Sequence, residues 1–139
     1  MPQEHKDLLS VLLVEDEVLV RLSIAEDLRQ GGLTVLEAAH ADEASTILAS
    51  HAPGIGVVVT DIQMPGSMDG LALARLIRER YPSLRIAVLS AASPKVLATV
   101  PADIVLTKPH SPSQLVKQVV VLLERPAANG SRSSNVGNS

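Results

Sequence analysis

The chain has 139 residues, a formal net charge of −3 and no cysteine. That length fits a single domain, and the lack of cysteine excludes a disulfide framework and a thiolate metal site. No block of lysine and arginine occurs, so nucleic acid is not an expected partner. No apolar run reaches the roughly 18 residues of a membrane span, and the polar start lacks a signal-peptide core. We therefore expect a cytoplasmic protein with no membrane partner.

The first half of the chain alternates short apolar runs with longer amphipathic stretches. We predict a strand at 9–14, a helix at 17–30 that stops at the Gly31-Gly32 pair, and a strand at 33–37. A helix at 41–50 follows and ends before Pro53, and a third strand covers 56–60. A helix at 69–80, closed by Tyr81-Pro82, completes this half.

The second half repeats the alternation, with strands predicted at 85–89 and 103–106 and a short helix at 94–99 between them. The last helix takes Ser111 as its N-cap and Pro112 as its first residue, and ends near Glu124. The strands are apolar on both sides, as expected where helices cover both faces of a sheet. The predicted fold class is α/β, a (βα)5 doubly wound sheet of five parallel strands.

The predicted organisation is one domain at 8–125, preceded by a polar leader at 1–7. The segment 126–139 is small, polar and rich in glycine and serine, so we expect a disordered tail. We find neither an internal repeat nor a second domain.

Chemically useful side chains follow four of the predicted strands. Glu15 and Asp16 come after the first, Asp61 after the third, Ser90 ends the fourth, and Lys108 follows the fifth. Parallel strands bring these positions to one edge of the sheet, and open α/β sheets bind their ligands at that edge. We therefore expect the three carboxylates, the hydroxyl and the amine to meet there.

Like charges held this close oppose folding, and a hard divalent cation would relieve the conflict. Mg²⁺ prefers oxygen ligands, commonly one or two carboxylates with water and phosphate oxygens. Lys108 is a point charge suited to a phosphate oxygen, and Ser90 can donate to one. Taken singly, Asp61 could be a turn former, the Glu15-Asp16 pair could face a helix dipole, and Ser90 and Lys108 could be surface groups. Their coincidence favours a phosphoryl-acceptor site.

Several motifs, in this order, carry a resemblance to the receiver domain of two-component response regulators. They are VLLVEDE at 11–17, TDIQMP at 60–65, DG at 69–70, LSA at 89–91 and LTKP at 106–109. The resemblance covers about 8–124 and implies the flavodoxin-like strand order 2-1-3-4-5. It suggests a stand-alone, CheY-like receiver that works as a phosphorylation-controlled signalling module.

The resemblance implies that Asp61 accepts a phosphoryl group from a sensor histidine kinase or a phosphotransfer protein. It implies that Asp16 and Asp61 bind Mg²⁺ directly with the backbone carbonyl of Gln63, and that Glu15 acts through a metal-bound water. Such a module would phosphorylate itself from a donor and slowly hydrolyse the product, without being a turnover enzyme. An unidentified downstream protein would then receive the signal.

The remaining implied roles concern the bound phosphoryl group. Ser90, Ala91 and Lys108 would bind it and respond to it, and the peptide before Pro109 is a candidate for the cis form. Three departures from the family pattern are visible. The loop at 64–70 is one residue longer than usual, and Val105 stands where an aromatic ring is usual. Eighteen positions separate Ser90 from Lys108, about four fewer than usual, which is close to one helical turn.

The last two departures lie on the family's usual output face, so we expect an atypical output through the loop at 90–94, the first helix or the last helix. The last helix has apolar residues on more than one face. This surplus predicts either a partner or homodimer surface, or a helix well covered by the core, and the sequence leaves both open. The apolar positions are Leu115, Val116, Val119, Val120, Val121, Leu122 and Leu123.

Two rival functions stay open. A degenerate receiver would bind partners constitutively and never carry phosphate, which the intact acids disfavour and Val105 favours. A small Mg²⁺-dependent phosphatase with Asp61 as nucleophile would need a general acid beside it, and Gln63 cannot serve as one. A flavin-binding protein is disfavoured because Tyr81 is the only aromatic residue.

Overall fold

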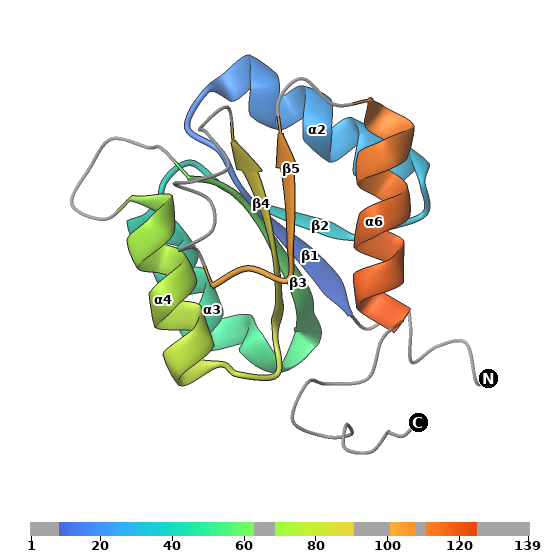
Figure 1. The fold of residues 1–139 in the computed structure, drawn as a ribbon. Coiled ribbons are helices and arrows are strands. Elements are labelled where there is room, and N and C mark those ends of the chain that lie inside the picture. The colour runs from blue at the N-terminus through green and yellow to red at the C-terminus, as the bar shows by residue number, and fades with distance from the viewer. Residues whose placement is uncertain (1–8, 63–68, 91–100, 108–110, 125–139) are drawn as a thin grey trace.

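The computed structural model describes residues 9–62, 69–90, 101–107 and 111–124. Its centre is a five-stranded parallel sheet with the order β2-β1-β3-β4-β5 (Figure 1). The predicted fold class and strand order are thereby confirmed. The strands are β1 (Ser10–Val14), β2 (Val35–Ala38), β3 (Ile55–Asp61), β4 (Arg85–Ser90) and β5 (Ile104–Thr107).

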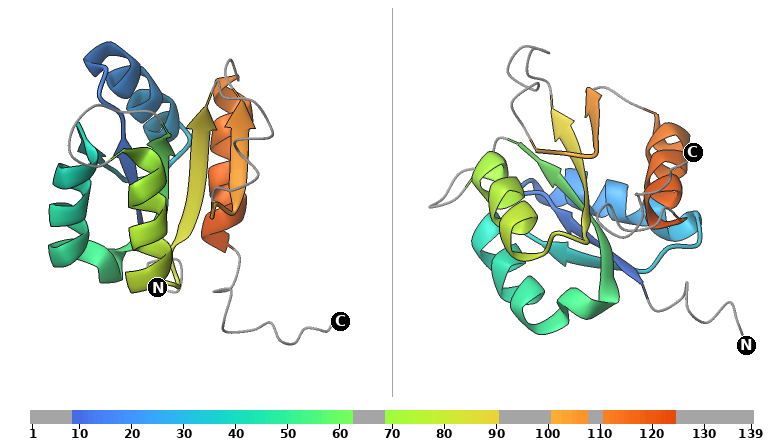
Figure 2. Two further views of the ribbon diagram at one scale, coloured as in Figure 1. Left: turned by 60° about the vertical axis from the view of Figure 1, so that its left-hand side comes forward. Right: turned by 60° about the horizontal axis from the view of Figure 1, so that its bottom comes forward.

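Helices cover both faces of the sheet (Figures 1 and 2). One face carries α2 (Val18–Gln30) and α6 (Pro112–Glu124), and the other carries α3 (Ala41–His51) and α4 (Gly70–Arg80). A short 3-10 turn, η1 (Ala52–Gly54), links α3 to β3. Within the described part of the chain, no helix is long and apolar enough to span a bilayer.

Two aliphatic cores form on the two faces because successive side chains of a strand point to opposite sides. In β1, Leu12 and Val14 enter the core under α3 and α4, whereas Val11 and Leu13 enter the core under α2 and α6. All four are fully buried. This double burial explains why the strands read as continuous apolar runs in the sequence.

The end of α2 corrects the predicted start of β2. Gly32 has a positive φ of 92°, a conformation that suits glycine. Its N–H donates to the carbonyl of Arg29 at 2.9 Å, and the N–H of Leu33 donates to the carbonyl of Leu28 at 3.2 Å. This pair of bonds closes the helix in a Schellman motif. Leu33 therefore belongs to the helix terminus, and β2 begins at Val35 instead of the predicted residue 33.

An ion pair and hydrogen bonds of Arg78 and Asp103 join the starts of β4 and β5, and they explain why β5 starts later than predicted. Arg78 of α4 forms an ion pair of 3.0 Å with Asp103 and donates to the carbonyl of Pro101 at 3.2 Å. Asp103 Oδ2 also accepts from the N–H of Ile86 at 2.7 Å. Asp103 thus acts as a side-chain anchor, and β5 runs one residue later than predicted, from Ile104.

Side-chain caps fix the starts of the remaining helices. Asp69 accepts from the N–H of Ala72 at 2.9 Å at the start of α4, and Ser111 accepts from the N–H of Gln114 at 3.1 Å at the start of α6. The predicted Ser111 cap is thereby confirmed. The predicted helix at 94–99, the leader at 1–7 and the tail at 126–139 lie outside the described residues.

The far end of α4 carries Tyr81, whose N–H donates to the carbonyl of Ile77 at 2.7 Å. Its own carbonyl accepts from the N–H of Leu84 at 3.0 Å, so it shapes the turn into β4. The ring is half-buried against the core under α3 and α4.

Most of the apolar surplus of α6 lies in the core. Leu115, Val119 and Leu122 are buried, and Val116 and Leu123 pack partly against the same core. Val121 is 43% exposed. The alternative of a helix covered by the core therefore accounts for most of these residues, and a homodimer surface on α6, which stays a prediction, would have to be built around Val121.

Candidate functional site

The strand register brings the first acids to the level of Asp61. Val14 of β1 pairs with Thr60 of β3, so the next residues, Glu15 and Asp61, follow at the same level on neighbouring strands. Glu15 is 2% exposed and Asp61 is 9% exposed. Asp16 is half-buried at the start of the turn into α2. Two nearly buried carboxyl groups thus end adjacent strands at the carboxyl edge of the sheet.

Asp61 is the last residue of β3. The predicted range of 56–60 had placed it just after the strand. It pairs with Leu89 of β4, and the carbonyl of Leu89 then accepts from the N–H of Ile62 at 3.3 Å. The hydroxyl of Thr60 donates to the carbonyl of Asp61 at 2.9 Å. The backbone of Asp61 is therefore held by the sheet on one side and by its own neighbours.

Gly70 packs against the backbone of Asp61. Its N–H donates to the carbonyl of Ile62 at 3.0 Å. A Cβ on Gly70 would contact the Asp61 carbonyl oxygen and would lie 2.7 Å from the Cα of Ile62. Glycine is thus required because the start of α4 approaches the end of β3 more closely than any side chain allows.

Glu15 is held by hydrogen bonds at three points. Its N–H donates to the carbonyl of Ala38 at 3.1 Å, and its Oε2 accepts from the N–H of Glu17 at 3.1 Å. Its carbonyl accepts from Nη1 of Arg21 at 2.9 Å. These contacts fix the turn that carries the Glu15-Asp16 pair.

Ser90, predicted to end the fourth strand, is the last residue of β4, so the strand runs one residue beyond the predicted range of 85–89. Ser90 is 1% exposed. It pairs with Thr107, the last residue of β5 and the neighbour of Lys108 in sequence. Four strand ends, from β1, β3, β4 and β5, therefore meet at one edge in the order that the sequence predicts. The predicted roles of Gln63, Ala91, Lys108 and Pro109 fall outside the described residues.

The donor set at this edge suits a hard cation. Carboxylate oxygens are the ligands that Mg²⁺ prefers, and it commonly takes one or two of them with water and phosphate oxygens. Among the described residues, which include Glu15, Asp16 and Asp61, no three acidic, histidine or cysteine side chains are grouped so that they could hold a metal. The expected convergence of all three carboxylates is therefore not found. Two direct carboxylate ligands, Asp16 and Asp61, still fit this chemistry and stay a prediction.

A family model for the response regulator receiver domain matches residues 11–120. The chain belongs to this family. The match spans the sheet from β1 to β5 and reaches into α6, so it includes the edge at which Asp61 lies.

Relatives of this receiver domain differ widely in length. The sensor kinase CckA of Brucella abortus is 38% identical over 120 residues, a match that covers 84% of this chain and 13% of that protein. The transcriptional regulatory protein SphR of Synechococcus elongatus is 34% identical over 126 residues, or 83% of this chain and 49% of that protein. The chain therefore spans less than half the length of these curated relatives.

Solved structures share the fold of this receiver domain. A response regulator receiver protein from Sinorhizobium medicae superposes with a TM-score of 0.77 at 31% identity, covering 84% of this chain and 95% of that chain. The response regulator TrrA from Thermotoga maritima, solved in complex with Mg²⁺-BeF, superposes with a TM-score of 0.74 at 29% identity. That match covers 82% of this chain and 98% of the other.

Val105 lies in β5 of the receiver domain, where it pairs with Val88. It is half-buried and packs against the core under α3 and α4. A β-branched aliphatic side chain at this position has no long flat ring to rotate between buried and exposed positions. An atypical switch therefore stays a prediction, and the structure gives the position of the residue on which it depends, Val105 in β5.

Two residues of the site have roles that the sequence alone does not reveal. Gly70 was read as part of a motif, but its close approach to Asp61 needs the packing of α4 on β3 to be known. Arg21 was read only as part of an amphipathic helix, although it follows Asp16 by five positions and so lies little more than one helical turn beyond the acids.

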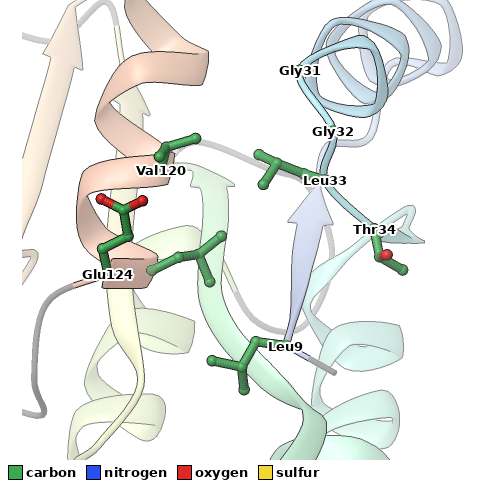
Figure 3. Close-up of a pocket in the computed structure, with 8 residues that line it drawn as sticks. Leu9, Gly31, Gly32, Leu33, Thr34, Val120 and Glu124 are labelled. Carbon is green, nitrogen blue, oxygen red and sulfur yellow. The ribbon is translucent and has the colours of Figure 1, made fainter. Parts of the chain in front are cut away.

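A cavity of about 530 Å³ lies at the opposite end of the receiver domain (Figure 3). Leu9 at the start of β1, Leu33 and Thr34 before β2, and Val120 and Glu124 of α6 line it. These positions mark the amino ends of the strands. The cavity is therefore remote from Asp61.

Proposed function

We propose that this receiver domain accepts a phosphoryl group on Asp61 from a histidine kinase or a phosphotransfer protein, with Mg²⁺ bound beside it. The observation that carries this proposal is the position of Asp61. It is a nearly buried carboxylate at the carboxyl end of a central strand, level with Glu15 on the next strand. Membership of the receiver family supports the same role.

The transfer moves a phosphoryl group from a phosphohistidine nitrogen to a carboxylate oxygen of Asp61. The P–N bond breaks, a P–O bond forms, and the released imidazole takes up a proton. Catalysis of such transfers is largely positioning and charge neutralisation. The fixed backbone of Asp61 supplies the positioning, and the Ser90 hydroxyl at the end of β4 is our candidate for the first contact with a phosphoryl oxygen. Lys108, next in sequence to Thr107, is our candidate for the second contact.

Asp16 and Asp61 would hold Mg²⁺, with the Gln63 carbonyl as a third protein ligand and Glu15 acting through water. When bound, the ion supplies positive charge that offsets the carboxylates and the incoming phosphoryl oxygens. Support comes from the donor chemistry of this edge and from the TrrA structure, which was solved with Mg²⁺-BeF.

The direct test is intact-mass measurement after incubation with a small phosphodonor such as acetyl phosphate and Mg²⁺. We expect the native chain to gain the mass of one phosphoryl group and Asp61→Asn to gain none. Asp42→Asn is the matched control, because Asp42 is an exposed aspartate in the first turn of α3 and should leave the gain intact. Equal labelling of native protein and Asp61→Asn would refute the assignment.

The alternative is a degenerate receiver that binds its partners without phosphate. The specific observation in its favour is Val105, which removes the usual ring from the switch position. A native chain that never gains mass from the phosphodonor or from a phosphorylated histidine protein would favour this alternative. Rapid multiple turnover of a phosphoester would instead indicate a phosphatase, whereas we propose only self-phosphorylation and slow self-hydrolysis.

A further inference from the structure

One side chain of α2 bridges the acidic turn and the neighbouring edge strand. Arg21 donates from Nη1 to the carbonyl of Glu15 at 2.9 Å and from Nε to Oε1 of Glu37 at 3.3 Å. The side chain of Arg21 is 16% exposed and that of Glu37 is 23% exposed, so this bridge is largely sheltered from water. Sheltered, multiply bonded guanidinium groups hold one geometry better than surface ion pairs do.

Glu37 is itself anchored from its other side. Its Oε2 forms an ion pair of 3.1 Å with Nη1 of Arg29, and Nη2 of Arg29 donates to the carbonyl of Val35 at 2.9 Å. Glu37 also lies in β2, where it pairs with Leu13 of β1. The guanidinium of Arg21 is therefore fixed to the sheet and not to a mobile surface group.

The carbonyl of Glu15 belongs to the same planar peptide unit as the N–H of Asp16. Fixing that carbonyl restricts the rotation of the peptide unit directly before the Cα of Asp16. The contact made by Arg21 therefore restrains the position of a predicted metal ligand without touching its carboxylate.

We infer that Arg21 is a positioning residue for the Mg²⁺ site, acting through the Glu15–Asp16 peptide. This inference rests on the proposed function, because it assumes that Asp16 and Asp61 hold the ion. Groups that orient a metal ligand typically contribute a factor of about 10 to 100 in metal affinity. The contact between Arg21 and the Glu15 carbonyl is thus part of the site, although Arg21 is not a ligand.

Charge alone predicts the opposite effect. A guanidinium near the site repels Mg²⁺, so removing it would tighten binding if electrostatics dominated. Positioning predicts weaker binding after the same change. The sign of the effect therefore separates the two roles of Arg21.

The experiment titrates the full chain with Mg²⁺ and follows amide NMR signals of Glu15, Asp16 and Asp61. We expect Arg21→Gln and Arg21→Lys each to raise the Kd for Mg²⁺ about tenfold. The lysine variant keeps the charge but cannot donate through a planar fork to two acceptors at once. In phosphorylation by acetyl phosphate, the Mg²⁺ concentration for half-maximal rate should rise by the same factor, and the rate at saturating Mg²⁺ should change little.

Arg29→Gln is the matched control. Arg29 lies on the same helix and binds the same Glu37, but it is 49% exposed and has no hydrogen bond to Glu15 among the contacts described above. Its variant should keep the native Kd for Mg²⁺. A general loss of structure would move both variants together and would also lower the saturated rate.

Unchanged or tighter Mg²⁺ binding in Arg21→Gln would overturn the inference. If Arg21→Gln does not fold, Arg21→Lys decides the matter, since it preserves charge and most of the side-chain volume. A native chain that binds no Mg²⁺ and takes no phosphate would instead refute the proposed function. A native chain that does both while the Arg21 variants match it refutes only the role of Arg21.

Discussion

Gly70 controls how closely α4 approaches the acceptor strand. We expect Gly70→Ala to lower the free energy of unfolding by about 1–3 kcal/mol, because the added methyl group meets the backbone of Asp61 and Ile62. Backbone cannot move aside as a side chain can, so the acceptor carboxylate should also shift. Denaturant unfolding measures the first effect, and labelling by acetyl phosphate measures the second.

Gly56→Ala is the matched control for this prediction. A Cβ there would lie 2.6 Å from Cδ2 of Leu123, which is the end of a flexible side chain, and Gly56 lies at the amino end of β3. We expect a smaller loss of stability and normal labelling. If Gly70→Ala were labelled as fast as the native chain and unfolded no more easily, the close approach of α4 would affect neither stability nor labelling, and the prediction would be wrong.

At the scale of elements, α2 exposes apolar residues beside the carboxyl edge of the sheet, where Asp61 lies, which we call the acceptor edge. Val18, Leu19 and Leu22 are 55%, 81% and 49% exposed, and they occupy the first turns of the helix that follows the Glu15-Asp16 pair. In the proposed transfer a phosphohistidine would approach Asp61 over this edge, and we expect its donor protein to cover these residues. An apolar cluster of this kind is a suitable contact surface for it.

We expect Leu19→Ser to slow phosphotransfer from a cognate donor protein at least several-fold while labelling by acetyl phosphate stays native. Stability should change by less than about 0.5 kcal/mol, because the side chain is almost fully exposed. Stopped-flow mixing with the phosphorylated donor protein measures the rate of phosphotransfer, and labelling by acetyl phosphate is the control. Equal slowing with both donors would mean that the substitution disturbs the site and not the docking of a protein.

The elements also show how far sequence reasoning reaches. The helix from Val18 to Gln30 was predicted to within one residue, because its apolar period and its terminal glycines both lie in the local sequence. The start of β2 was wrong by two residues, since only the Schellman bonds reveal that Leu33 belongs to the helix end. Asp103 was assigned to a strand because its role as a partner of Arg78 depends on the folded chain.

The site was predictable for a related reason. Parallel strands place their carboxyl ends at one edge, so the order of elements alone brings Glu15, Asp61 and Ser90 together. The contacts of Arg21 and Gly70 were not predictable, because they depend on how α2 and α4 pack on the sheet. Strand order does not determine side-chain direction beyond the last paired residue, so the grouping of Glu15, Asp16 and Asp61 around one ion could not be derived from it.

At the scale of the whole molecule, like charges at the acceptor edge should make stability depend on Mg²⁺. We expect the melting temperature to rise with Mg²⁺, with a gain of about 1.4 kcal/mol at ten times the Kd. Chelation by EDTA should reverse the gain. Asp61→Asn, which removes one of the charges, should respond less. Scanning calorimetry with NaCl at matched ionic strength is the control, and an equal gain in NaCl would point to general screening.

The placement of Tyr81 has a practical consequence for following this protein in solution. With no tryptophan and a single tyrosine, the chain absorbs weakly at 280 nm, and its ultraviolet emission comes from one ring. That ring sits where α4 gives way to the turn before β4, against an aliphatic core and away from the acceptor edge. A change in its fluorescence lifetime after addition of phosphodonor would report a rearrangement carried along α4 to its far end. A constant lifetime would confine the response to other elements, and no engineered label would be needed to tell the two apart.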